Sequence, residues 1–159
     1  MSLETTAEEI SPQVALRRAL SLFPTGVVAL AAVVDGEPTG IAVNSFTSVS
    51  LDPPLVAVCP ARTSATWPML ARATRIGLSV LGADQESTAR SLASRTGDRF
   101  ADIAWRATEG GAIHMDGAAL WLECEIRNSF DGGDHEIVTL EVINSEAFPE
   151  VTPLVFHLS

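Results

Sequence analysis

The stretch VVALAAVVDGEPTGIAVNSFTSVSLDPPLVAVCP, residues 27–60, decides the fold. Its first two apolar runs flank the dipeptide Asp35–Gly36, which is typical of a tight β-hairpin turn. A third apolar run, residues 55–59, follows two prolines and is continuous enough to be a strand buried on both faces. Before those prolines, residues 44–50 gather asparagine and hydroxylated side chains around one aromatic. Solvated loops have this composition, and so do sites that bind a polar ligand through many short hydrogen bonds.

The rest of the chain alternates further strands with a few helices. Ser11 suits the N-cap of a helix with Pro12 in its first turn, and Asp84 suits the cap of a later helix. The glycine-rich residues 101–118 predict irregular structure. This order favours a mainly β protein, a small antiparallel barrel with flanking helices, over a doubly wound sheet. We expect helices within 11–23, 65–73 and 83–100, and strands within 75–82, 120–130 and 135–148.

The first of the two long C-terminal strands shows a regular alternation. Leu122 and Cys124 fall on one face, whereas Glu123 and Glu125 fall on the other. The pattern predicts a half-buried strand with both glutamates toward solvent. The turn DGGD, residues 131–134, joins it to the second strand.

Length and charge exclude several classes of function. The 159 residues suit one domain, which we place at residues 11–159 after an acidic tail at residues 1–10. The formal net charge of −10 disfavours nucleic acid and anionic membranes as partners. All ten basic residues are arginine, so lysine chemistry is excluded and a phosphate must be bound by arginine, hydroxyls or backbone N–H groups. No apolar run is long enough to cross a bilayer and no basic signal region is present, which predicts a cytoplasmic location.

Common catalytic and nucleotide-binding motifs are absent from the sequence. There is no dinucleotide-binding or P-loop glycine motif, no zinc-protease motif and no nucleophile elbow. Cys59 and Cys124 lie in apolar runs without metal or redox spacing, so buried thiols are favoured over a nucleophile. His135 is the centre of an acidic cluster at residues 131–136, but such clusters are more often solvated hairpin tips, and no metal is expected. The segment RTSAT, residues 62–66, offers a guanidinium and hydroxyls to an anion.

Taken together and in order, these segments resemble the flavin reductase-like proteins of the FMN-binding split-barrel group, the small reductase components of two-component flavin monooxygenases. The resemblance runs from about Phe23 to the C-terminus and rests on the segments FPTGVVAL, GIAVNSFTSVSLDPPLVAVC, SAT, GLSVL, DRF and GGDHEIVTLEV. It implies a split β-barrel of antiparallel strands. It also implies an NAD(P)H:flavin oxidoreductase that reduces FMN or FAD by hydride transfer to N5, with NADH or NADPH as donor, and supplies reduced flavin to a partner monooxygenase.

The resemblance also implies the site residues. Residues 44–48 would surround the flavin ring, and residues 62–66 would reach the phosphate, with Arg62 or Arg99 completing the charge. His135 would lie beside the nicotinamide as the catalytic residue. The implied flavin-binding set is Asn44, Ser45, Phe46, Thr47, Ser48, Cys59, Pro60, Arg62, Ser64, Thr66, Arg99 and Phe100.

Two other functions are compatible with the sequence. One is a split-barrel oxidase or flavin-binding protein that retains FMN as a prosthetic group, and the other is a cofactor-free β-barrel interaction module. A homodimer is also expected. The long apolar strands together with Trp67, Trp105 and Trp121 offer more hydrophobic surface than one small barrel needs.

Overall fold

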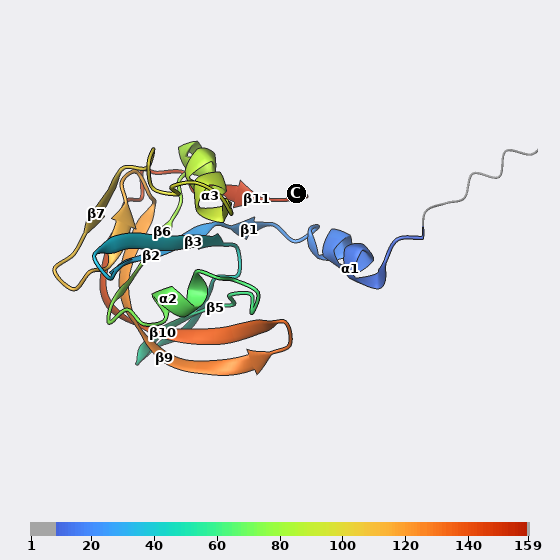
Figure 1. Cartoon of the computed structure of the whole chain (residues 1–159), viewed down its shortest axis with the longest axis horizontal. Helices are drawn as coiled ribbons and strands as arrows, with labels where there is room; N and C mark the ends of the chain where they lie inside the picture. Colours follow the sequence, from blue (N-terminus) through green and yellow to red (C-terminus); the bar gives the residue numbers. More distant parts are fainter. Residues whose placement is uncertain (1–8, 159) are drawn as a thin grey trace, which may run out of the picture.

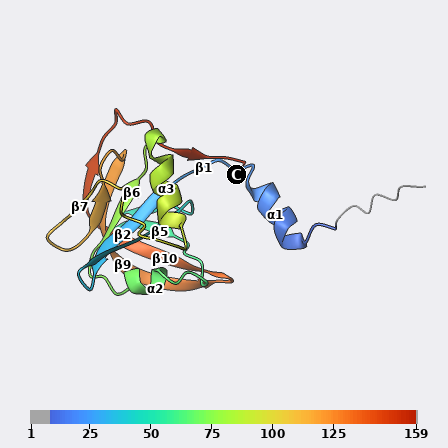
Figure 2. The same ribbon diagram turned by 45° about the horizontal axis from the view of Figure 1, so that its top comes forward.

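The structure, a computed structural model, describes residues 9–158. Residues 1–8 of the predicted acidic tail therefore lie outside the described residues. Strands form the body of the molecule, while the first helix, α1 (Pro12–Leu20), stands apart from it (Figures 1 and 2). None of the helices in residues 9–158 is long and apolar enough to span a bilayer.

Short elements make up the body. Besides α1, the helices are α2 (Trp67–Leu70), the single-turn η1 (Ala83–Gln85) and α3 (Glu86–Ala93). The strands are β1 (Thr25–Gly26), β2 (Val28–Val34), β3 (Glu37–Val43), β4 (Thr47–Leu51), β5 (Pro54–Val58), β6 (Ile76–Val80), β7 (Trp105–Ala107), β8 (Ile113–Met115), β9 (Leu120–Gly132), β10 (His135–Ala147) and β11 (Val155–Phe156).

One antiparallel sheet with the strand order β3-β2-β6-β9-β10-β5-β4 dominates the fold. Its edge strands β3 and β4 are joined by residues 44–46 alone. The seven strands are separated by six gaps of about 4.8 Å each, so the two edges of a flat sheet would lie about 29 Å apart. Because this linker reaches about 14 Å at most, the sheet must curl until its edges approach each other. The predicted antiparallel split barrel is confirmed, and the linker lies at its seam.

Most of the predicted elements are present. The β2–β3 hairpin turns through Asp35 and Gly36, whose φ angles are 51° and 79°. Ser11 caps α1, because its hydroxyl accepts a hydrogen bond from the Val14 N–H at 3.3 Å. The prediction that Asp84 caps the later helix was wrong. Asp84 lies inside η1, and α3 ends at Ala93 instead of extending to residue 100.

Residues 101–118 are less irregular than predicted. They contain the β7–β8 hairpin, in which Trp105 pairs with Met115. The hairpin forms because its apolar side chains are buried: Ile113 and Met115 are fully buried, and Phe100 packs edge-to-face on Trp105 at 6.1 Å between ring centroids. Tertiary packing therefore creates strands that the local glycine content does not predict.

Two hydrophobic clusters stabilise the body. One fills the barrel and includes Leu30, Leu78 and Leu140, and the other lies between the outer face of β2, the β7–β8 hairpin and α3. The predicted alternation in β9 holds for Leu122 and Cys124, which are buried. For Glu123 it was wrong, since this glutamate is only 9% exposed. Thr108, which directly follows β7, contacts the Glu123 carboxylate, and this segment removes it from solvent.

Candidate functional site

A pocket lies at the seam of the barrel. Its volume is about 710 Å³, within the range of small-molecule sites. Four residues from the predicted site contribute to its wall: Asn44 and Ser45 from the seam linker, Cys59 after β5, and His135 at the start of β10. The remaining lining residues are Val27, Ala42, Val43, Ala61, Glu86, Ala89, Arg90, Ala93, Leu154, Val155 and Phe156.

Ser45 fixes the seam linker to the end of β5. Its hydroxyl accepts a hydrogen bond from the Cys59 N–H at 2.9 Å and donates one to the Cys59 carbonyl at 3.3 Å. Asn44 beside it is exposed, and its side chain has no hydrogen-bond partner within residues 9–158. Ser45 therefore shapes the pocket, while the Asn44 amide is available to a ligand.

The other residues of the predicted ring-binding segment do not line this pocket. Phe46 is half-buried and packs against the cluster inside the barrel. Thr47 and Ser48 are exposed on β4, where the Thr47 hydroxyl donates to the Ser48 carbonyl at 3.2 Å.

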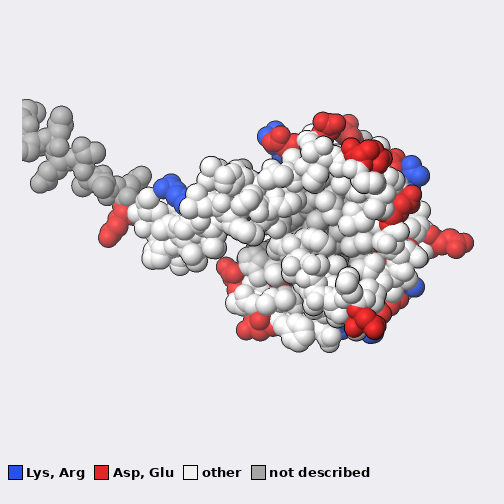
Figure 3. Space-filling model, turned by 180° about the vertical axis from the view of Figure 1, so that it is seen from behind, with Lys and Arg blue, Asp and Glu red and all other residues white. Residues whose placement is uncertain are grey.

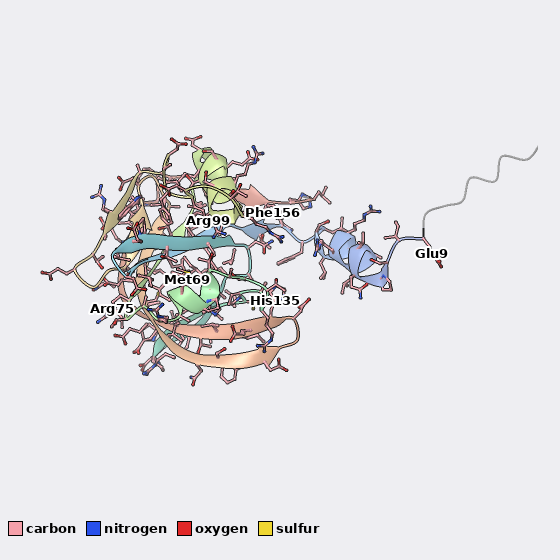
Figure 4. All side chains as sticks on the ribbon, viewed as in Figure 1. Glu9, Met69, Arg75, Arg99, His135 and Phe156 are labelled. Carbon is pink, nitrogen blue, oxygen red and sulfur yellow. The ribbon has the colours of Figure 1, made fainter. Side chains whose placement is uncertain are left out.

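The turn between β9 and β10 brings His135 to the pocket. The turn pairs with the segment that follows β5: the Glu136 N–H donates to the Pro60 carbonyl at 3.0 Å, and the Arg62 N–H donates to the Asp134 carbonyl at 2.9 Å. Figure 4 shows His135 at this tip. Pro60 is buried, and its contribution is this backbone contact. Segments far apart in sequence thus place His135 beside Cys59 and Ser45.

The Arg62 guanidinium strengthens the same contact. Its Nε donates to the Gly133 carbonyl at 2.9 Å, and its Nη2 donates to Asp131 Oδ1 at 2.7 Å. The guanidinium therefore binds the turn that carries His135 and does not line the pocket.

Asp134 orients the His135 ring. The Nδ1 of His135 donates to Asp134 Oδ1 at 2.7 Å, which leaves Nε2 as the nitrogen for a ligand. The imidazole side chain is 45% exposed, so it is accessible from the pocket. This hydrogen bond sets the tautomer of the neutral ring.

The two aspartates of the turn have lowered pKa values. The hydrogen bond from Arg62 is the largest cause for Asp131, and the hydrogen bond from His135 is the largest cause for Asp134. A carboxyl group whose pKa is lower in the folded chain stabilises the fold above its unfolded pKa. That contribution is lost as the pH falls through the folded pKa, below the ordinary value of 3.8. The turn should therefore loosen in acid.

We predict that Arg62→Gln raises the pKa of Asp131 toward its ordinary value, because the charged donor is removed. The pKa of Asp134 should stay low, since His135 remains. Carboxyl carbon chemical shifts followed by NMR against pH measure both groups in one sample. An unchanged Asp131 titration in the folded variant would contradict the ion pair.

The predicted phosphate-binding residues contact protein groups outside the pocket. Ser64 accepts a hydrogen bond from the Trp67 N–H at 3.1 Å, at the start of α2. Arg99 donates to the Thr66 hydroxyl at 3.1 Å, to the Gly40 carbonyl at 2.9 Å and to the Ser94 carbonyl at 2.7 Å. Phe100 is 7% exposed in the outer cluster. These residues tie α2, β3 and the segment after α3 together.

One face of α3 lines the pocket although no residue on it was predicted to belong to the site. Glu86, Ala89, Arg90 and Ala93 line the pocket, and their i, i+3, i+4, i+7 spacing places them on one side of a helix. The Arg90 Nη2 lies 2.6 Å from Glu86 Oε1. The helical spacing was visible in the sequence, but the packing of this face against the seam was not.

The two cysteines differ in their surroundings. Cys124 is fully buried, and burial, together with the neighbouring Glu123 charge, raises the pKa of its thiol to about 12. Cys59 is half-buried and lines the pocket. Only Cys124 fits the predicted buried thiol.

The fold and the pocket define a split-barrel protein with a cavity of small-molecule size at its seam, between an apolar wall and a polar linker. The chain matches the family described as "Flavin reductase like domain" over residues 20–159 and belongs to that family. Similar proteins support the assignment. A flavin reductase from Pseudomonas putida is 36% identical over 158 residues, which cover 99% of this chain and 92% of the relative.

Solved structures resemble the chain over most of its length. The NADH:FAD oxidoreductase SgcE6 of Streptomyces globisporus, in complex with NAD and FAD fragments, is 39% identical. Its superposition has a TM-score of 0.87 and covers 96% of this chain and 93% of that chain. BorF, the flavin reductase component of a bacterial two-component tryptophan halogenase, is 35% identical with a TM-score of 0.83, and covers 91% of this chain and 92% of that chain.

Proposed function

We propose that this chain is an NAD(P)H:flavin oxidoreductase that reduces FMN or FAD and supplies the reduced flavin to a partner monooxygenase. The observation that carries this proposal is the seam pocket, formed in a chain that matches an NADH:FAD oxidoreductase over 96% of its length. When bound, the flavin supplies the ring that accepts hydride from the nicotinamide. The protein then has to bind and orient the two cofactors, and no side chain must transfer a proton in that step.

The lining residues suit a flavin. Val27, Ala42 and Val43 offer an apolar wall for a flat ring, and the free Asn44 amide offers a donor and an acceptor to its polar edge. Arg90 lies at the α3 wall and is paired with Glu86 at 2.6 Å, so a phosphate would bind there by replacing this carboxylate as its partner. His135, with Nε2 available, would contact the nicotinamide.

The proposed role requires the flavin to leave after reduction. Purified protein should therefore elute colourless from gel filtration and oxidise NADH or NADPH only when FMN or FAD is added. A yellow protein whose flavin stays bound through the column would favour the alternative that retains FMN. Absence of oxidation of both NADH and NADPH, with either flavin, would contradict the proposed activity.

We predict that His135→Ala raises the Michaelis constant for NADH or slows hydride transfer by about tenfold to a hundredfold. Flavin affinity should change little, because stacking and the seam linker bind the ring. Stopped-flow reduction at saturating flavin and varied NADH measures the effect. Glu136→Gln is the matched control, since the Glu136 carboxylate accepts from the Ser129 hydroxyl at 3.0 Å and does not line the pocket. Wild-type kinetics for His135→Ala at every NADH concentration would remove His135 from the site.

A homodimer is part of the proposal. Helix α1 buries none of its residues, and apolar side chains are exposed next to it: Leu22 is 66% exposed and Phe23 75%. On the face seen in Figure 3, acidic groups lie around the rim and a wide area carries no charged side chain. A second copy would cover such a surface. Trp67 does not contribute as expected, because it is 5% exposed. Analytical ultracentrifugation tests the dimer, and a fully active monomer would contradict it.

The remaining parts of the proposal are the partner protein and the cellular location. A partner monooxygenase is supported by relatives such as the reductase subunit HsaB of a flavin-dependent monooxygenase from Rhodococcus jostii, which is 36% identical over 151 residues. These cover 95% of this chain and 77% of the relative. The cytoplasmic location stays a prediction.

A further inference from the structure

A second pocket lies at the other end of the barrel. Its volume is about 340 Å³, and it shares no lining residue with the seam pocket. In the view of Figures 1 and 4, β7, which contributes to it, lies at the left, whereas His135 and Phe156 of the seam pocket lie at the right. None of the residues predicted to bind flavin or nicotinamide lines this pocket. Its lining residues are Arg106, Ala107, Thr108, His114, Trp121, Glu123, Asn144, Ser145 and Glu146.

A buried carboxylate forms part of its wall. Glu123 is 9% exposed, and its carboxylate accepts hydrogen bonds from the Thr108 hydroxyl at 3.0 Å and from the Asn144 amide at 3.4 Å. No ion pair to Glu123 forms within residues 9–158. Arg75 passes close by, since both side chains border Gly110, but its guanidinium pairs with Glu125 at 3.4 Å. Among the described residues only neutral donors therefore bind the Glu123 carboxylate, and buried carboxylates are rare without a cationic partner.

The neighbouring groups in the pocket are also acceptors. The Asn144 amide donates to Glu123, which leaves its Oδ1 to accept. His114 Nε2 donates to the Leu122 carbonyl at 2.9 Å, so Nδ1 of the neutral ring is an acceptor as well. Arg106 is the one cation among the described lining residues, and its charge is paired at 2.8 Å with Asp116, which does not line the pocket.

An aromatic surface completes the wall. The Trp121 indole stacks on His114 with 5.2 Å between ring centroids and donates its N–H to the Met115 carbonyl at 2.7 Å. The Arg106 guanidinium lies over the same indole, 5.3 Å from the ring centroid. Phe148 packs edge-to-face with the same indole at 4.8 Å between ring centroids, and the part of the ring that lines the pocket offers apolar surface to a ligand. A short alkyl group would pack there, next to the acceptors.

We propose that this pocket binds a small organic primary ammonium ion. Its three N–H donors match the acceptors on Glu123, Asn144 and His114, and its charge complements a carboxylate that only neutral donors of the described chain bind. A pocket of about 340 Å³ suits a ligand much smaller than a flavin or a dinucleotide. Metal ions are a weaker match, because no group of three His, Cys, Asp or Glu side chains within the described residues is placed to bind one.

Isothermal titration of the full chain with butylammonium chloride tests the proposal. Sodium butyrate and n-butanol are the comparison ligands, and FMN at saturation occupies the seam pocket. Butylammonium should bind, and the neutral and anionic analogues should bind about tenfold to a hundredfold more weakly, because a charge-assisted hydrogen bond is lost. Equal binding of butanol, no binding of butylammonium, or binding that FMN abolishes would each overturn the proposal.

Two variants locate the bound ion. Glu123→Gln keeps the side-chain shape and should lower the affinity for butylammonium about tenfold or more. Glu125→Gln is the matched control on the same strand, because Glu125 pairs with Arg75 at 3.4 Å and does not line the pocket. Equal affinity in the Glu123→Gln variant and the wild type would overturn the site. Should Glu123→Gln fail to fold, Glu146→Gln at the exposed rim tests the same charge, with a smaller loss expected, and an unchanged affinity there would count against the proposal.

Discussion

Replacing Gly77 by alanine is expected to destabilise the protein by about 3 kcal/mol, the largest stability effect we predict. A Cβ atom at this position in β6 would lie 2.0 Å from the Ile113 carbonyl oxygen and 2.7 Å from the Ile113 nitrogen. Both are backbone atoms of β8, so a side-chain rotation cannot relieve the clash. The β7–β8 hairpin would have to move away from the barrel and expose the outer hydrophobic cluster.

Urea unfolding followed by circular dichroism measures this effect. Gly26→Ala is the matched control, because a Cβ at Gly26 meets no atom within 4 Å. The control should unfold near the wild-type midpoint. A Gly77→Ala midpoint equal to that of Gly26→Ala would show that β8 does not cross β6 as closely as described.

Replacing Ser45 by valine is expected to weaken flavin binding by about tenfold to a hundredfold while the protein still folds. The hydroxyl makes two hydrogen bonds to the Cys59 backbone, and together they are worth about 1–3 kcal/mol. Their loss leaves the Cys59 N–H without its partner and frees the linker that closes the seam. Flavin titration of the purified variant, monitored by fluorescence quenching, gives the affinity.

Thr47→Val separates this effect from a general loss of hydroxyl groups. Thr47 is exposed, and its hydroxyl bonds to the adjacent Ser48 carbonyl, so flavin affinity should change by about twofold or less. Were Thr47→Val to weaken flavin binding as much as Ser45→Val does, hydroxyls of residues 44–48 would bind the ring directly, as the resemblance first implied. Wild-type affinity in Ser45→Val would remove the linker from the site.

The sequence predicted those parts of the fold that depend only on neighbouring residues, such as a hairpin turn and a helix start. Asp35 and Gly36 favour the left-handed turn of the β2–β3 hairpin, and Ser11 with Pro12 favours a helix start. The alternation around Cys124 predicted which side of β9 is buried. It failed at Glu123, because the segment after β7 covers the outer face of the strand and no pattern within β9 can indicate that.

The site was harder to predict because it depends on contacts between distant segments. The resemblance brought Asn44, Ser45 and His135 together, and the structure places all three at one pocket. The sequence alone could not show that Arg62 binds the Asp131 turn or that Arg99 joins three segments, since each guanidinium meets carbonyls and side chains that folding brings near. A sequence segment with an arginine beside hydroxylated residues looks the same whether its guanidinium binds a phosphate or another part of the protein.

Anaerobic mixing of the purified chain with NADH and oxidised flavin tests the central claim most directly. We predict that the yellow absorbance of FMN or FAD is lost at a rate proportional to enzyme concentration, with one flavin reduced for each NADH oxidised. We also predict that the reduced flavin passes freely through a membrane that retains the protein. Oxidised flavin that stays yellow with both NADH and NADPH, at enzyme concentrations where the seam pocket is shown to bind it, would contradict the account.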